Sequence, residues 1–217
     1  MEYLACPFEY EGKDSMVAMM EEKYQTESTS AELPDVPRTA RELFDVLPPL
    51  PGFRVEVIGG KLIVSPMGSP EHFWIGEELA DALRPLRKER GWRGSQHGPG
   101  ICIEGPRDSL SPDYVLTSPD CPRWGSNELL SSGVIMAAEL VSPSSVRDDH
   151  EDKLRLYALG KVPVYLLIDP IAECPSATVY SDVEDSAYRA ITSVPMGKPL
   201  YLPDPINFEL DTSIFMV

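Results

Sequence analysis

The stretch GVIMAAELVSPSSVRDDHEDKLRLY (residues 133–157) combines an apolar run with a polar segment that has the character of a helix. A second apolar run, VPVYLLIDP (residues 162–170), follows it directly. Two nearly continuous apolar strands on either side of one helix are typical of a βαβ unit whose strands are buried on both faces. The chain is therefore expected to form an α/β domain with a mixed central β-sheet.

Glu139 interrupts the first apolar run. A carboxylate in an apolar core costs several kcal/mol unless it is paired, hydrogen-bonded or bound to a metal. A solvated acid at a strand end is the plainer alternative, and the apolar residues around Glu139 disfavour it. The residue becomes informative if other charged side chains converge on it.

The composition excludes several classes of protein. The chain has 217 residues, 42% of them hydrophobic, which suffices for one domain with a sizeable core. It shows neither a membrane-span pattern nor a signal-peptide pattern, and its four cysteines are widely spaced. These features predict a reduced, cytoplasmic protein that does not enter a membrane. The net charge of −16 disfavours a protein that coats DNA with a broad basic surface, but it leaves a local basic groove open.

The N-terminal part of the chain differs from the rest. Residues 1–37 contain nine acidic and two basic residues and have no sustained apolar period. This composition predicts an acidic, flexible N-terminal tail. The folded domain is expected over residues 38–217, and the pattern TARE, with Thr39 and Glu42, predicts a capping box at its first helix.

Turn residues delimit the remaining elements. The segment FRVEVIGGKLIVS (residues 53–65) predicts an N-terminal hairpin, and ATVYSD with AYRAITS (residues 177–193) predicts a C-terminal one. A helix is expected from the cap at Ser69 to the stop at Gly91, kinked or shortened by Pro85. Trp74 in this helix is expected in the core.

Three carboxylates are candidates for a common site: Glu56 in the first hairpin, Asp113 before the apolar run YVL, and Glu139. The helix after Glu139 adds Asp149, Lys153 and Tyr157, which are spaced by four and share one face. The start of a helix in a βα unit lies near the end of the preceding strand, so the long Lys153 side chain can reach Glu139. An exposed ion pair between Asp149 and Lys153 is the alternative, worth only a few tenths of a kcal/mol.

Two acids and a lysine form a recognisable chemical set. Carboxylate oxygens bind Mg²⁺ or Mn²⁺, which lower the pKa of a water molecule that attacks phosphorus. A lysine ammonium orients that water or stabilises the negative charge that develops on the phosphate. The set is suited to metal-dependent hydrolysis of a phosphodiester bond.

From about Thr39 to Pro170 the chain resembles the Uma-two family of bacterial restriction endonucleases, within the PD-(D/E)XK nuclease superfamily. The matching segments are FRVEVIGGKLIVSP, SPEHFWIGEELADAL, SPDYVL and AAELVSPSSVRDDHEDKLRLYALGKVPVYLLIDP. The resemblance implies a restriction-endonuclease-like fold, with a mixed central sheet flanked by helices, and a Mg²⁺- or Mn²⁺-dependent endonuclease that hydrolyses DNA.

The resemblance also assigns residues. It makes Asp113 and Glu139 the motif acids that hold the metal, with Glu56 in support. The superfamily lysine normally follows the glutamate by two residues, where this chain has Val141, and Lys153 matches the members whose lysine has moved to the next helix. The supporting motif positions are matched by Asp149, Tyr157 and His72, and for His72 a capping or packing role is favoured.

A second function stays open from a different class: a catalytically silent module of the same fold that binds protein or nucleic acid. A homodimer is also left open. Convergence of Asp113, Glu139 and Lys153 at a cleft with a basic rim would favour the nuclease. A Lys153 side chain that points into solvent would favour the silent module.

Overall fold

The computed structural model describes residues 36–216 of the chain. The first of its two large sheets, sheet A, has six strands and contains both parallel and antiparallel pairs. In spatial order its strands are β2 (Lys61–Pro66), β1 (Phe53–Ile58), β5 (Ser109–Leu110), β4 (Gly100–Cys102), β8 (Glu128–Leu130) and β7 (Arg123–Trp124). The predicted N-terminal hairpin is its β1–β2 edge, which turns at Gly59 and Gly60, both at positive φ.

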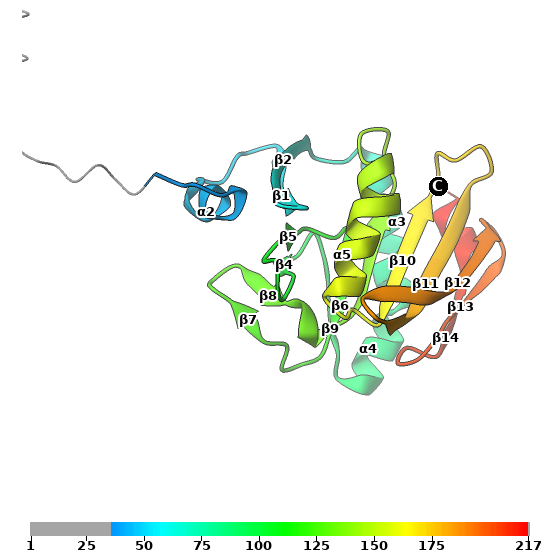
Figure 1. Cartoon of the computed structure of the whole chain (residues 1–217). Coiled ribbons are helices and arrows are strands. Elements are labelled where there is room, and N and C mark those ends of the chain that lie inside the picture. Colours follow the sequence, from blue (N-terminus) through cyan, green and yellow to red (C-terminus); the bar gives the residue numbers. More distant parts are fainter. Residues whose placement is uncertain (1–35, 217) are drawn as a thin grey trace, which may run out of the picture. The chain divides into compact units, whose positions relative to one another are not determined.

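The second large sheet, sheet B, is the predicted mixed central sheet (Figure 1). In spatial order its strands are β12 (Ala187–Pro195), β11 (Ser176–Glu184), β10 (Val164–Asp169), β9 (Val134–Leu140), β6 (Tyr114–Thr117) and β3 (Arg93–Gln96). Strands β9 and β10 pair in parallel, and the helix α5 (Lys153–Leu159) connects them. The βαβ unit and the C-terminal hairpin β11–β12 are therefore confirmed.

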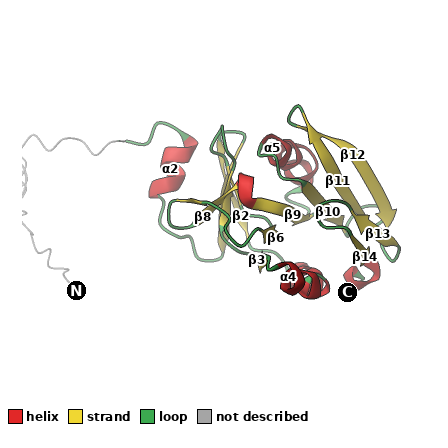
Figure 2. Ribbon diagram, turned by 90° about the horizontal axis from the view of Figure 1, so that it is seen from below, coloured by secondary structure: helices red, strands yellow, loops and turns green. Residues whose placement is uncertain are grey.

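The strands β9 and β10 are apolar because sheet B is covered on both faces. Met136, Ala138 and Leu140 of β9 belong to a core that also contains Ile75 and Leu79. Ala137 and Val141 face a second core, which contains Leu156 and Tyr157 of α5. Figure 2 shows α5 on one side of these strands and α4 on the other. By alternation along the strand, Glu139 lies on the face that α5 covers.

The other helices begin and end where the sequence predicts. Helix α2 (Ala40–Val46) has the capping box of Thr39 and Glu42. The helical stretch after Ser69 is divided into α3 (Pro70–Ala82) and α4 (Arg84–Arg90), because Pro85 cannot continue the hydrogen-bond pattern of α3. Helix α4 ends at Gly91, which has a left-handed φ of 69°. None of the helices between residues 36 and 216 is both long and apolar enough to cross a membrane.

Two further details concern the C-terminal segment and Trp74. The C-terminal segment forms a separate two-stranded sheet of β13 (Pro199–Leu202) and β14 (Phe208–Asp211), which packs its leucines into the core on the α3 side. Trp74 is not a core residue: 53% of it is exposed, because the apolar face of α3 is formed by Ile75, Leu79 and Leu83. Aromatic character alone does not specify which helix face is buried.

The predicted acidic tail lies outside the described residues, apart from positions 36 and 37, so its division from the domain stays a prediction. A chain that begins at Arg38 keeps the capping box of α2 and every described core residue. We expect its melting temperature to lie within a few degrees of that of the full chain, measured by calorimetry. A large loss of thermal stability would show that residues 1–37 pack on the domain.

Candidate active site

Three strands bring the predicted acids to one small cavity. On β1, Arg54 and Glu56 are two residues apart and therefore share one face of the strand. The antiparallel register of β6 and β9, in which Tyr114 lies opposite Ala138, brings Asp113 next to Glu139. These four side chains line a cavity of about 60 Å³. Glu56, Asp113 and Glu139 are all buried, with exposures of 3%, 2% and 0%.

The helix after β9 supplies the lysine. A π-helical turn (Asp148–Asp152) precedes α5 directly, and both Asp149 and Lys153 line the cavity. The Lys153 Nζ atom lies 3.0 Å from Glu139 Oε2, 3.1 Å from Asp149 Oδ1 and 3.6 Å from Glu56 Oε1. Lys153 is only 2% exposed, so the alternative of an exposed surface ion pair with Asp149 is wrong. π-Turns within helices are frequent at functional sites.

The charges around Lys153 determine its protonation. Burial by itself lowers the pKa of a lysine, but the carboxylates of Glu139, Glu56 and Asp149 outweigh it and raise the pKa of Lys153 well above its usual value. Lys153 is therefore an ammonium ion at neutral pH. It can donate a hydrogen bond or stabilise an anion, but it cannot act as a general base.

Asp113 is held by a different set of donors. Its Oδ1 atom lies 2.6 Å from Arg54 Nη2 and 2.9 Å from His72 Nε2, and its Oδ2 accepts a hydrogen bond from the Leu140 backbone N–H at 2.8 Å. Burial works to raise the pKa of Asp113, but the His72 hydrogen bond and the Arg54 charge hold it well below its usual range. Asp113 is thus a carboxylate at neutral pH.

Glu139 is less readily ionised than an ordinary glutamate. Burial raises its pKa well above the usual value, Lys153 opposes this, and Asp113, Asp149 and Glu56 add to it. The Tyr157 hydroxyl donates to Glu139 Oε1 at 2.7 Å. Apart from its ion pair with Lys153, Glu139 Oε2 has no hydrogen-bond partner among residues 36–216.

The cluster fits a divalent cation in its donor atoms and its charge. Four buried carboxylates face two permanent cations, Arg54 and Lys153, so full ionisation leaves a net charge of −2. A dication would neutralise this excess, and carboxylate oxygens are suitable ligands for Mg²⁺ or Mn²⁺. In the described part of the chain, no three His, Cys, Asp or Glu side chains are arranged as a ready ligand group. For a cation to bind, the Arg54 or Lys153 side chain must therefore move away from the carboxylate oxygens that it contacts.

The structure brings together every residue that the sequence predicts for the site. His72 contacts Asp113 through its ring, while the cap of α3 is the Ser69 hydroxyl, which accepts from the His72 backbone N–H. Val141 is buried beside α5 and leaves the lysine position to Lys153. Arg54 was not identified from the sequence. It could have been found because it lies two residues before Glu56 on a predicted strand and therefore shares its face. The basic rim that would have favoured the nuclease further is not found among the described residues: besides Arg54 and Lys153, the charged lining residues are acidic or His72.

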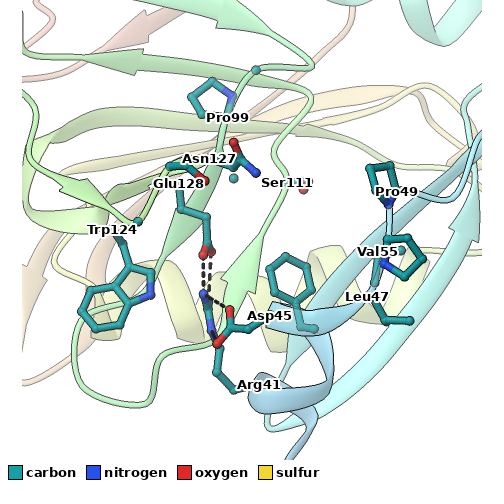
Figure 3. Close-up of a pocket in the computed structure, with 16 residues that line it drawn as sticks. Arg41, Asp45, Leu47, Pro49, Val55, Pro99, Ser111, Trp124, Asn127 and Glu128 are labelled. Carbon is teal, nitrogen blue, oxygen red and sulfur yellow. Dashed lines mark hydrogen bonds and ion pairs between the residues drawn. The ribbon is translucent and has the colours of Figure 1, made fainter.

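A much larger cavity, of about 990 Å³, lies between α2 and sheet A (Figure 3). Val55 lines it, so it is on the opposite face of β1 from Arg54 and Glu56. Its one basic side chain, Arg41, is already paired with Asp45 and Glu128. The larger cavity is therefore separate from the acid–lysine cluster, and its size does not make it the catalytic site.

Comparisons with known proteins bear on the fold and the family of the chain. No curated protein matches the chain. A crystal structure from Anabaena variabilis ATCC 29413, described as "a putative nuclease belonging to DUF820", is 19% identical, with a TM-score of 0.63, and the match covers 82% of this chain and 97% of that one. At this identity the likeness shows the fold. The family model Uma2, described as "Putative restriction endonuclease", matches residues 41–213, and the chain therefore belongs to the Uma2 family.

Proposed function

We propose that the protein is a divalent-metal-dependent endonuclease that hydrolyses phosphodiester bonds in DNA. The observation that carries the proposal is the convergence of Asp113, Glu139 and Lys153 on one buried cluster, with Lys153 Nζ 3.0 Å from Glu139 Oε2. A structural role alone does not require four buried carboxylates with two cations, because apolar residues of similar size are often as stable. The cluster is better explained by chemistry.

Asp113 and Glu139 would hold the cation, and Glu56 would support it. Bound there, Mg²⁺ or Mn²⁺ lowers the pKa of water and offsets charge on the phosphate oxygens. The Ser111 backbone N–H fixes Glu56 Oε1 at 2.7 Å, and the Tyr157 hydroxyl fixes Glu139. These hydrogen bonds keep the carboxylates oriented before substrate arrives.

The cations of the cluster have separate tasks. Lys153, kept protonated by its carboxylate neighbours, orients the attacking water or stabilises the charge that develops on phosphorus-bound oxygen. Arg54 and His72 position Asp113. The three described cysteines are free thiols, which fits our inference that the protein works in the cytoplasm.

The silent-module alternative has one observation in its favour. The cavity has a volume of only about 60 Å³, and Asp148 adds a fifth acid to its lining. A polyanionic substrate must overcome this charge unless a cation is bound. Cation binding by the protein therefore discriminates between the two functions.

Millimolar Mn²⁺ or Mg²⁺ is expected to raise the melting temperature of the parent protein by several degrees, because a ligand that binds only the folded state stabilises it by mass action. Asp113→Asn should abolish the rise, since the amide gives neither the charge nor the second ligand oxygen. Asp211→Asn, which changes an exposed acid far along the chain, is the matched control and should retain it. Scanning calorimetry with and without cation makes the measurement, and an unchanged parent would favour the silent module.

A further inference from the structure

A third cavity, of about 190 Å³, lies where the two large sheets meet. Sheet B contributes Arg93 from β3, and sheet A contributes Arg123 from β7. Hydroxyl side chains also line it: Ser95, Thr117 and Ser118. The combination of guanidinium and hydroxyl groups supplies hydrogen-bond donors and positive charge, which is the chemistry that binds a phosphate group.

The charge of the residues that line this cavity is opposite to that of the residues that line the two other cavities described above. Its lining contains two arginines and no acidic residue. The cavity beside α2 pairs its single arginine with two carboxylates (Figure 3), and the catalytic cavity has five acids. A cavity with an uncompensated positive lining is distinctive in a chain whose net charge is −16. Asp120 adjoins Cys121 in the sequence but does not line the cavity.

The two guanidinium groups are available to a ligand. Within the described part of the chain, neither Arg93 nor Arg123 makes a side-chain hydrogen bond or an ion pair, and both residues are exposed. Two arginines of the domain are, in contrast, engaged by the fold: Arg54 with Asp113, and Arg87 with the Gly94 carbonyl. The pair is thus not explained by the stability of the fold.

The strand β6 relates this cavity to the catalytic cluster. Asp113 directly precedes β6 and alternates with Val115 and Thr117 of the strand on one face, with Asp113 in the catalytic cavity and Thr117 in the arginine-lined one. Four residues of strand span about 13 Å. This is the axial rise of about four steps of one DNA strand.

We propose that Arg93 and Arg123 form a subsite for a backbone phosphate of the nucleic acid, away from the bond that is cleaved. This inference rests on the proposed nuclease function. The two arginines supply the uncompensated positive charge that the catalytic cavity lacks, because its Arg54 and Lys153 are paired with carboxylates. Phosphate contacts of this kind position a nucleic acid without reading its sequence. A free phosphate ion has the same chemistry, and the experiment separates the two sources.

The test measures binding rather than cleavage. The affinity of the full-length protein for a fluorescent 20-base-pair DNA duplex is measured by anisotropy in EDTA, over a range of salt concentrations. The variants are Arg93→Ala, Arg123→Ala and the double variant. Arg189→Ala, an exposed arginine of β12, removes the same charge elsewhere and is the matched control.

Each single variant is expected to weaken binding about five- to tenfold at 0.1 M salt and to reduce the slope of log K against log salt by about 0.9, as loss of one phosphate contact requires. The double variant should reduce the slope by about 1.8, and Arg189→Ala should match the parent. Equal slopes for the parent and the double variant, or a parent that does not bind the duplex, would overturn the proposal. A melting-temperature rise with inorganic phosphate that the double variant loses, with unchanged duplex binding, would assign the site to a free anion instead and would also overturn it.

Cleavage is recorded separately, so that the two proposals fail independently. Reduced slopes in a protein that does not cut DNA would support the phosphate subsite and count against the nuclease. Unchanged slopes in a protein that cuts DNA would reject only the subsite.

Discussion

Lys153→Met is expected to lower the free energy of unfolding at neutral pH by about 3–5 kcal/mol, because it leaves buried carboxylates without their shared cation. The Lys153 ammonium contacts Glu139, Asp149 and Glu56 within 3.6 Å, and methionine has a similar length but no charge. Hydrolysis should fall by 10²-fold or more, the order expected when one electrostatic stabiliser of the transition state is removed. Denaturant unfolding and single-turnover cleavage give the two numbers.

A divalent cation should partly restore the stability of this variant, because it supplies positive charge to the same carboxylates. The rise in melting temperature with Mn²⁺ is therefore expected to be larger in Lys153→Met than in the parent. Lys198→Met, which removes an exposed lysine, is the matched control and should change neither stability nor cleavage. Cleavage at the parental rate by Lys153→Met would eliminate the role of the relocated lysine in catalysis.

Glu139→Gln is expected to abolish hydrolysis without loss of stability at neutral pH. The pKa of Glu139 is raised in the folded protein, so at pH values between the ordinary and the raised pKa folding takes up a proton at this site. The stability that this group contributes is present below the ordinary glutamate pKa and is lost as pH rises through the raised folded value. Glutamine does not ionise and has no such loss, so at neutral and alkaline pH the variant should be at least as stable as the parent. The measurement is the free energy of unfolding as a function of pH, without metal.

Glu128→Gln provides the comparison for a buried glutamate with a structural role. Glu128 pairs with Arg41 (Figure 3). It also accepts a hydrogen bond from Ser109 Oγ at 2.6 Å. Breaking this ion pair should lower stability and leave the cleavage rate unchanged, the reverse of the result for Glu139. If Glu139→Gln instead destabilised the protein and retained cleavage, Glu139 would be a structural residue.

Several features of the fold and the site could be predicted because a local physical rule decides them. The apolar residues around Glu139 indicated a strand covered on both faces, and the structure covers it with α3 on one side and α5 on the other. Pro85 fixed the break between α3 and α4. The convergence of Asp113 with Glu139 followed from adjacent strands, since the residues at their ends are neighbours.

Other features depend on tertiary contacts that no local pattern specifies. The spacing of Asp149 and Lys153 suits an exposed ion pair as well as a buried one. The pair is buried because of the π-turn before α5 and because sheet A covers it. The exposure of Trp74 depends on which face of α3 meets sheet B. Arg54 became meaningful only when β1 was placed against Asp113. A basic rim at the acid–lysine cavity would have favoured the nuclease, but the two arginines Arg93 and Arg123 line a separate cavity.

Cleavage of supercoiled plasmid DNA by the purified full-length protein tests the nuclease function most directly. The parent protein is assayed with Mg²⁺, with Mn²⁺ and with EDTA, beside Asp113→Asn prepared in the same way. We expect nicked and linear DNA with the parent and a divalent cation, and intact plasmid with EDTA or with Asp113→Asn. Equal cleavage by the parent and Asp113→Asn, or intact plasmid with the parent in both cations, would contradict a metal-dependent nuclease centred on Asp113, Glu139 and Lys153.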